Sequence, residues 1–562
     1  MAKARKTQGR IIKSAMKPAL DRDVQYVLDC IREAEDATRD QREAWAELWD
    51  LYQNKQDYSN KKRWQSKVFI PKIFMTVEQA AAMVKRAVMS VNRLFTMTPK
   101  DPNNQVAVQF QSQVERSFAE QLSKSNFPDA YGEMIKSGFL LGLGVPKVLW
   151  DGNGKRLVFG NVKADHCYID PYFQPGVHPY PKFIVEHKMM DLADFREEAK
   201  AINQEAGKPI YDMAEINKIE GGFTDNDTQE EDRTHLGISD FSSQSPKVCL
   251  HEFWGTVVSE DGMTKKPNQL IVVANKQYKV RKQDNPFDHK RPPYLPTYPI
   301  PYPHRGVGGV SLVAPVATLQ YAYNNLFNMV MDNLNFTVNK SFEINTAAVL
   351  NASTLTDIYP GKLIHKNGPN AAVTPMETTQ IGQDSFLTMQ LIESEIQRGT
   401  AVTEFVMGLS GVSKTATEAQ LKTSQAQGIF DVIARNIEIH SLKPLLEMAL
   451  DVLIQYGVIP MQVKGLYDIT VGGLTLLLQR QEQIQQIQGV LGMALQMPSL
   501  GQMTNIPMLF KKLLNLYNLG DVYQENVNIQ APTMEQQQAI HQQAMNDAKQ
   551  FVQRVQTQGV TE

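Results

Sequence analysis

The first 150 residues show the spacing of amphipathic helices. After Pro71, apolar side chains recur at steps of three and four residues, which is the period of one helix face. We predict a helix there with a core-facing stripe formed by Val77, Ala81, Val84, Val88, Val91 and Phe95. A helix lying on a membrane surface shares this pattern and is the weaker alternative.

From about residue 155 the pattern becomes that of strands. Short runs of β-branched and aromatic residues are separated by Gly, Pro, Asn and Asp, as in RLVFGNVKADHCYIDPYF, KFIVEHKMM, VCLHEFWGTVV and NQLIVVANKQYKV. Residues 208–246 are acidic, Ser-rich and poor in large apolar side chains, which predicts a mobile insert. The Pro-rich run 285–309 then predicts a stiff connector rather than a peptide ligand.

Residues 309–338 form a long, weakly charged stretch in which Asp332 is the single formal charge. A transmembrane helix needs only about 20 apolar residues, so length alone permits one. The stretch nevertheless contains Gln320 and asparagines at 324, 325, 328, 333 and 335, which would be costly in lipid. We therefore predict a helix packed among other protein segments, and a membrane pore is the less favoured alternative.

The rest of the chain is predicted to be mainly helical. A strand-and-turn segment follows residue 338, and helical spacing returns from about 383 to 407. A long helix is expected over 416–456, bent at Pro444 because proline lacks the amide donor. Beyond residue 474 the composition is rich in Gln and Met, which suits peripheral or subunit-facing helices. The predicted fold class is α+β, mainly α.

Composition limits the chemistry. Lys plus Arg number 58 against 60 Asp plus Glu, so the chain lacks the basic excess of a tight nucleic-acid binder. Cys30, Cys167 and Cys249 are widely spaced, which argues against disulfides and fits a reducing compartment. Residues 1–23 lack the apolar run of a secretory signal and form either a basic binding arm or a tail without a partner.

A metal site is not predicted. Candidate ligands gather in one region, but their spacing matches no familiar ligand pattern, and strand edges often carry such residues. These residues are His166, Cys167, Asp170, His178 and His187. We expect neither a metal nor a cofactor.

The loop before the long helix is one residue away from a phosphate-binding loop. Its residues are Gly408, Leu409, Ser410, Gly411, Val412, Ser413, Lys414 and Thr415, with serine in place of the second glycine. The flanking segments are helical and no alternating strands follow, so a nucleotide-dependent enzyme is a poor fit and no catalytic residue is predicted. Thr415 and Glu418 instead form a capping box that begins a helix.

The order of these segments resembles the portal proteins of tailed bacteriophages, most closely those of short-tailed phages. NVKADHCYIDPYF followed by KFIVEHK is similar to a strand region of the family's wing, and GVGGVSLVAPVATLQYAYNNL is similar to its first stem helix. LSGVSKTATEAQ resembles the tunnel loop and the start of the long wing helix, and WQSKVFIPKIFMTVEQ is also typical. The likeness spans nearly the whole chain.

The resemblance implies a portal fold with wing, stem, clip and crown regions assembled as a ring. Residues 24–308 correspond to the wing, 309–337 to the first stem helix, and 338–382 to the clip. Residues 383–407 correspond to the second stem helix and 408–415 to the tunnel loop. The long kinked wing helix and its following segment take up 416–473, and the crown with the C-terminal helices takes up 474–562.

The resemblance also implies a function without catalysis. A ring of twelve subunits at one capsid vertex of the virion would conduct double-stranded DNA during packaging and ejection, after assembly in the host cytoplasm. Its partners would be other copies of the chain, the terminase large subunit, the major capsid and scaffolding proteins, and tail adaptor proteins, with no membrane. The residues implied to face the terminase or adaptor from the clip are Lys362, His365, Lys366 and Asn367.

The charges fit a conduit. Residues 306–425 contain six basic and nine acidic side chains, a net charge of −3. A wall of this kind limits phosphate neutralisation and therefore drag on moving DNA. The candidates for the stem lumen are Asp332, Glu393, Glu395 and Arg398. Lys414 is expected to face the lumen, and a solvated lysine at a helix start is the alternative.

Overall fold

The computed structural model describes residues 20–89, 94–152, 154–174, 177–219, 246–259, 263–302, 308–339, 342–344, 373–375, 382–400, 402 and 432–471, with ten single positions between 484 and 549. The chain divides into two compact units, Met1–Arg86 with Thr96–Val471, and Ala87–Phe95 with Gly472–Glu562. The following description concerns the first unit. The described residues form an α+β structure that is mainly α, as predicted.

Four helices make up most of the N-terminal part: α1 (Arg22–Tyr52), α2 (Lys72–Met89), α3 (Gln105–Lys124) and α4 (Phe127–Leu141). The stripe predicted on α2 is confirmed at Val77, Ala81 and Val84, which are buried. The prediction is wrong for Phe95, because α2 ends at Met89 and Phe95 begins strand β1 (Phe95–Pro99). Strand β1 pairs with β11 (Tyr467–Val471), a distant partner that local periodicity does not reveal.

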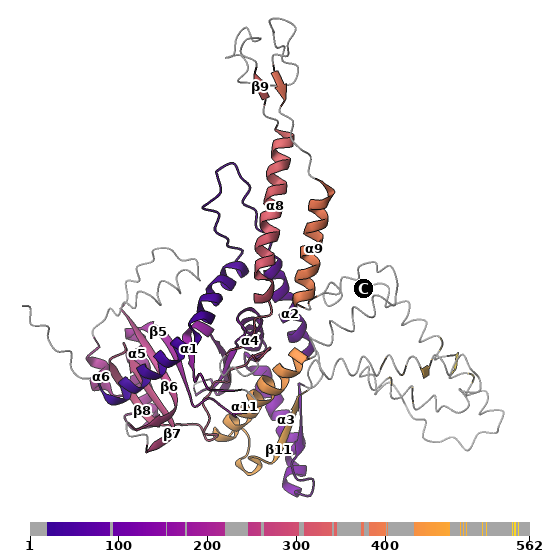
Figure 1. Cartoon of the computed structure of the whole chain (residues 1–562). Coiled ribbons are helices and arrows are strands. Elements are labelled where there is room, and N and C mark those ends of the chain that lie inside the picture. Colours follow the sequence, from indigo (N-terminus) through magenta and orange to yellow (C-terminus); the bar gives the residue numbers. More distant parts are fainter. Residues whose placement is uncertain are drawn as a thin grey trace, which may run out of the picture. The chain divides into compact units, whose positions relative to one another are not determined.

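The predicted strands form a five-stranded antiparallel sheet in the order β4-β5-β6-β7-β8. Their bounds are β4 Cys167–Ile169, β5 Phe183–Asp191, β6 Lys247–Val258, β7 Lys265–Ala274 and β8 Tyr278–Asp284. Helix α1 lies along this sheet (Figure 1), and its apolar side chains share one core with Val185, Phe253 and Val273. The sheet and α1 therefore bury each other's apolar faces.

Arg42 of α1 fixes the helix to the edge of the sheet. Its guanidinium donates to the carbonyl oxygens of Asp165 and Cys167 at 2.7 and 2.9 Å. It also lies over the Tyr168 ring, 4.8 Å from the centroid. Asp165 belongs to the short 3₁₀ turn η1 (Ala164–His166), so one side chain connects α1, η1 and β4.

A hairpin, β2 (Val145–Asp151) with β3 (Arg156–Val162), joins the sheet through a buried charge network. Glu186 of β5 accepts from Lys147 of β2 at 2.7 Å and from the Tyr294 hydroxyl at 2.5 Å, and it lies 3.2 Å from the Lys188 ammonium. Burial would raise the pKa of Glu186, but the charges of Lys188 and Lys147 with these hydrogen bonds hold it below its usual value. Ionised Glu186 therefore contributes to stability.

The structure describes only part of the predicted mobile insert, residues 208–219 and 246. Helix α5 (Leu192–Ala206) precedes it, and Met213–Asn217 inside it form the short helix α6. The sequence interpretation was wrong for α6, whose start is fixed because the Asp212 carboxylate accepts from the amides of Ala214 and Glu215. Residues 220–245 lie outside the described residues.

The connector into the apolar stretch is held by a close backbone approach. Gly142 ends α4 with φ of 77°, and a side chain there would place its Cβ 2.2 Å from the Gly309 carbonyl oxygen. The Ser311 hydroxyl accepts from the amides of Val313 and Ala314, which starts the 3₁₀ turn η2 (Ala314–Val316). The α-helix expected from residue 309 accordingly begins later, as α8 (Ala317–Val338).

Helix α9 (Gln383–Thr400) lies beside α8, and beyond their ends β9 (Phe342–Ile344) pairs with β10 (Val373–Pro375), as Figure 1 shows. In the predicted long helix, the described part runs from residue 432. It contains a π-helical turn, η4 (Glu438–Leu442), before α11 (Lys443–Gln455). The irregularity that Pro444 predicted is therefore present as a π-turn, since proline supplies no amide for the regular helical hydrogen bond. The 3₁₀ turn η5 (Met461–Val463) leads from α11 to β11.

Candidate functional site

The candidate site is the pair of helices α8 and α9, which carries all four candidates for the stem lumen. Asp332 lies on α8, and Glu393, Glu395 and Arg398 lie on α9. The remaining candidates, residues 408–415, Glu418 and the four clip residues between 362 and 367, lie outside the described residues. The structure thus describes the helix pair but not the loop that follows it.

One face of α8 holds residues 66–73, an extended segment together with the first two residues of α2, by side-chain hydrogen bonds to their backbone. We call this row of side chains the amide ladder; its members are Gln320, Asn324, Asn328 and Asp332. Successive members are four residues apart, so they lie on the same helix face. Gln320, Asn324 and Asn328 are fully buried.

Side chains of the ladder bind both amide and carbonyl groups of the segment. Asn328 accepts from the Val68 amide at 2.8 Å and donates to the Val68 carbonyl at 2.9 Å. Asn324 accepts from the Ile70 amide at 3.0 Å, and Gln320 donates to the Ile70 carbonyl at 2.7 Å. The ladder therefore supplies the hydrogen bonds that a neighbouring strand would otherwise supply to an extended segment.

The two end members of the ladder, Gln320 and Asp332, bind backbone amides on either side of Val68 and Ile70. Gln320 also accepts from the Ile73 amide at 3.2 Å, next to the start of α2. Asp332 accepts from the Ser66 amide at 2.6 Å. The carboxylate proposed for the lumen thus has a structural partner within its own subunit.

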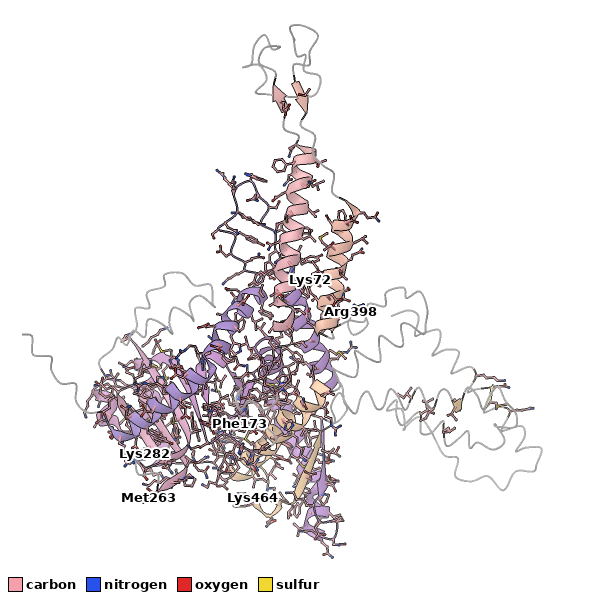
Figure 2. The ribbon with its side chains drawn as sticks, viewed as in Figure 1. Lys72, Phe173, Met263, Lys282, Arg398 and Lys464 are labelled. Carbon is pink, nitrogen blue, oxygen red and sulfur yellow. The ribbon has the colours of Figure 1, made fainter. Side chains whose placement is uncertain are left out.

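Lys72 connects three helices at the base of the pair (Figure 2). Its ammonium forms an ion pair with Glu393 of α9 and lies 5.4 Å from the centroid of the Tyr323 ring of α8. Because Lys72 is the first residue of α2, this contact joins α2, α8 and α9. Glu393, like Asp332, is therefore engaged within the subunit.

Glu395 and Arg398 differ from the other two candidates. They pair with each other at 2.8 Å across one turn of α9, and their side chains are 44% and 70% exposed. Figure 2 labels Arg398 on α9. An exposed pair of opposite charges gives this part of α9 no net charge and little stability.

Both helices also expose large apolar side chains. On α8 these are Met329, Leu334, Phe336 and Val338, and on α9 they are Phe386, Leu387 and Leu391. On α9, Ile396 is buried within the subunit, whereas Leu387 and Leu391 are more than half exposed. Exposed apolar side chains gathered on adjacent helices are typical of a surface that another protein covers.

Sequence reasoning missed the role of the ladder, although it noted the amides. The available signal was a polar residue at every fourth position, 320, 324, 328 and 332, of one helix. The same residues argued against a membrane helix. Among the described residues, no helix is long and apolar enough to cross a membrane.

Comparison with known proteins identifies one family. A family model described as phage SU10 portal protein matches residues 182–558. That range includes α8, α9 and residues 408–415. No curated protein matches the chain.

Proposed function

Because the chain belongs to the phage SU10 portal protein family, a structural and non-enzymatic family, we propose that its copies form a ring that conducts double-stranded DNA through one vertex of a tailed-phage capsid. The observation that carries this proposal is the family match, which covers residues 182–558. Packaging and ejection would use the same channel. The terminase large subunit, tail adaptor proteins, and the capsid and scaffolding proteins would be its partners.

The helix pair supports assembly with further copies. Seven large apolar side chains of α8 and α9 are exposed in the single subunit, and Met329 and Val338 are 68% and 72% exposed. In a ring, each helix pair would lie between two neighbours and these side chains would be covered. We therefore propose that α8 and α9, which lie in the predicted stem segments 309–337 and 383–407, are the two stem helices.

Charge at the helix pair suits passage rather than binding. Of the four lumen candidates, Glu395 and Arg398 pair with each other, so their charges neutralise each other, whereas Asp332 and Glu393 bind residues of other elements. A surface without net positive charge releases few counterions from DNA and so adds little affinity. We propose that this pair faces the channel, while Asp332 and Glu393 hold the stem to residues 66–73 and to α2.

We propose that Lys414, in the tunnel loop 408–415, supplies the direct contact with DNA. The proposal rests on the sequence: one lysine lies in a Gly- and Ser-containing loop just before a capping box at Thr415 and Glu418. A single lysine per subunit would touch phosphates without holding them. The wing (24–308 and 416–473), the clip (338–382) and the crown with C-terminal helices (474–562) complete the proposed assignment.

The clip is proposed to dock the terminase. Its described part is the β9–β10 pair, and its candidate contacts are Lys362, His365, Lys366 and Asn367. Three of these four side chains carry or can gain positive charge, which would suit an acidic partner surface.

Electron microscopy of the purified full-length protein tests the proposal. We expect closed rings of about a dozen subunits with a central channel wide enough for duplex DNA. A monomer at micromolar concentration, or rings without a channel, would refute it. In a ring reconstruction, burial of Lys414 between subunits would refute its assignment alone and leave the channel proposal intact.

A further inference from the structure

Three side chains able to ligate a metal lie together on one buried face of the five-stranded sheet. His187 belongs to β5, and Cys249 and His251 belong to β6. Their ligand atoms all lie within 4.8 Å of one another. The three residues are 3%, 0% and 2% exposed, so the cluster lies in the interior of the subunit.

The register of the sheet produces this cluster. His187 lies directly opposite His251, and Cys249 is two residues before His251, so all three side chains share one face. The backbone of Cys249 is fixed on both sides: its amide donates to the Asn275 side-chain oxygen at 3.0 Å, and its carbonyl accepts from the Asn275 amide at 2.7 Å. The cluster is therefore held by central strands and not by a loop.

The distances suit a tetrahedral ion. The Cys249 Sγ lies 3.7 Å from His251 Nδ1. Zinc bonds to sulfur and nitrogen at their usual lengths place the two ligand atoms about 3.6 Å apart in a tetrahedron. The His187 and His251 rings are nearly parallel, with an angle of 8° and centroids 5.1 Å apart. Binding one ion therefore requires a ring rotation about the Cβ–Cγ bond, without movement of the backbone.

A candidate fourth ligand, His166, lies beside His187. His166 of η1 has its ring centroid 5.1 Å from that of His187, and it is half-buried. Its ring is tilted by 46° to the His187 ring. Three imidazoles and one thiolate would make a closed four-coordinate set, the arrangement of structural zinc sites.

We propose that His187, Cys249 and His251 bind one zinc ion per subunit, with His166 as the fourth ligand. One thiolate with imidazoles favours zinc over magnesium or calcium, which prefer oxygen ligands. The ion would join β5, β6 and the η1 turn before β4. Its binding free energy would therefore add to the stability of the sheet on which α1 packs.

Metal content and cobalt spectroscopy test the site on the full-length protein, purified with an affinity tag that contains no histidine. We expect about one zinc per subunit by elemental analysis. After treatment with a chelator, added Co²⁺ should give visible d–d absorption of tetrahedral intensity and a sulfur-to-cobalt charge-transfer band. Folded protein that contains no zinc and gives neither band with equimolar Co²⁺ would overturn the proposal.

Variants assign the ligands. Cys249→Ser should abolish the charge-transfer band, whereas Cys167→Ser, a control at another buried cysteine, should retain it. A band that persists in Cys249→Ser, or that disappears only in Cys167→Ser, would overturn the assignment. If Cys249→Ser does not fold, His251→Gln provides the second variant: it should keep the charge-transfer band but weaken Co²⁺ affinity at least tenfold. Unchanged affinity in His251→Gln would also overturn the proposal.

Discussion

Replacement of Asn328 by leucine would test whether the amide ladder holds residues 66–73 against α8. Leucine has the same number of side-chain heavy atoms as asparagine, although it is bulkier, and it occupies the buried position without supplying a donor or an acceptor. The variant loses both hydrogen bonds to the Val68 backbone, at 2.8 and 2.9 Å, and a third to the Asn324 carbonyl at 2.8 Å. Only the first two join α8 to the extended segment.

The expected magnitude follows from these two bonds. Each contributes about 1 kcal/mol net, so the attachment of residues 66–73 should weaken by about 2 kcal/mol. At 1.4 kcal/mol for each factor of ten, the segment should open about 30 times more often. The Val68 side chain is 38% exposed, so water can reach its backbone groups once the segment opens, and the loss should stay near this value.

Amide hydrogen exchange measures this opening directly. Peptides covering residues 66–73 should exchange about 30-fold faster in Asn328→Leu, while peptides from the five-stranded sheet should be unchanged. Asn335→Ala is the matched control, because Asn335 is an exposed asparagine on the same helix. Equal exchange of residues 66–73 in the wild type and in Asn328→Leu would refute the role of the ladder.

Three further variants test the fold by chemical denaturation. Gly142→Ala should lower the free energy of unfolding by about 3 kcal/mol or more, because its Cβ would lie 2.2 Å from the Gly309 carbonyl oxygen. The control Gly207→Ala has a similar φ of 62° but no atom within 4 Å of the added Cβ, so it should lower this free energy by only about 1 kcal/mol. Equal losses in the two variants would contradict the close approach of Gly142 to Gly309. Glu186→Gln should cost about 3 kcal/mol at neutral pH, because it removes the buried carboxylate that pairs with the half-buried Lys147 and Lys188. Because folding lowers the pKa of Glu186, the ionised carboxylate stabilises the fold above the unfolded pKa of about 4.3, and this stabilisation is lost as pH falls through the folded pKa. The free energy of unfolding of Glu186→Gln should therefore fall less than that of the wild type as the solution is acidified. An unchanged dependence of stability on pH in the variant would contradict this role of Glu186. Arg398→Gln should leave the denaturation midpoint unchanged, since its ion pair is exposed, and a clear loss would show that α9 depends on it.

The sequence predicted the sheet well because its strands carry a local signal. Runs of β-branched and aromatic residues between turn residues were sufficient to locate β5, β6 and β7. The start of α8 was less predictable, because the apolar stretch from residue 309 continues through the connector. There Gly309 and Ser311 are fixed by contacts with the end of α4, about 170 residues earlier in the chain.

Long-range partners explain why the sequence did not predict the contacts made by the candidate-site residues. The spacing of Gln320, Asn324 and Asn328 is visible in the sequence, but their partners lie about 250 residues earlier, in a segment with no regular periodicity. The engagement of Glu393 by Lys72 has the same origin. Local patterns place side chains on a helix face, whereas the partner of that face depends on the tertiary fold.

The ladder also explains why α8 is only partly apolar. An apolar residue at position 324 or 328 would leave amide and carbonyl groups of residues 66–73 against a surface that cannot pair with them. The asparagine side chain carries both an acceptor oxygen and a donor amide, which at Asn328 match the amide and the carbonyl of Val68. The same substitution would make α8 more hydrophobic and weaken the argument against a membrane helix, to which these side chains contribute. Attachment of α8 within the subunit and its unsuitability for lipid therefore depend in part on the same side chains.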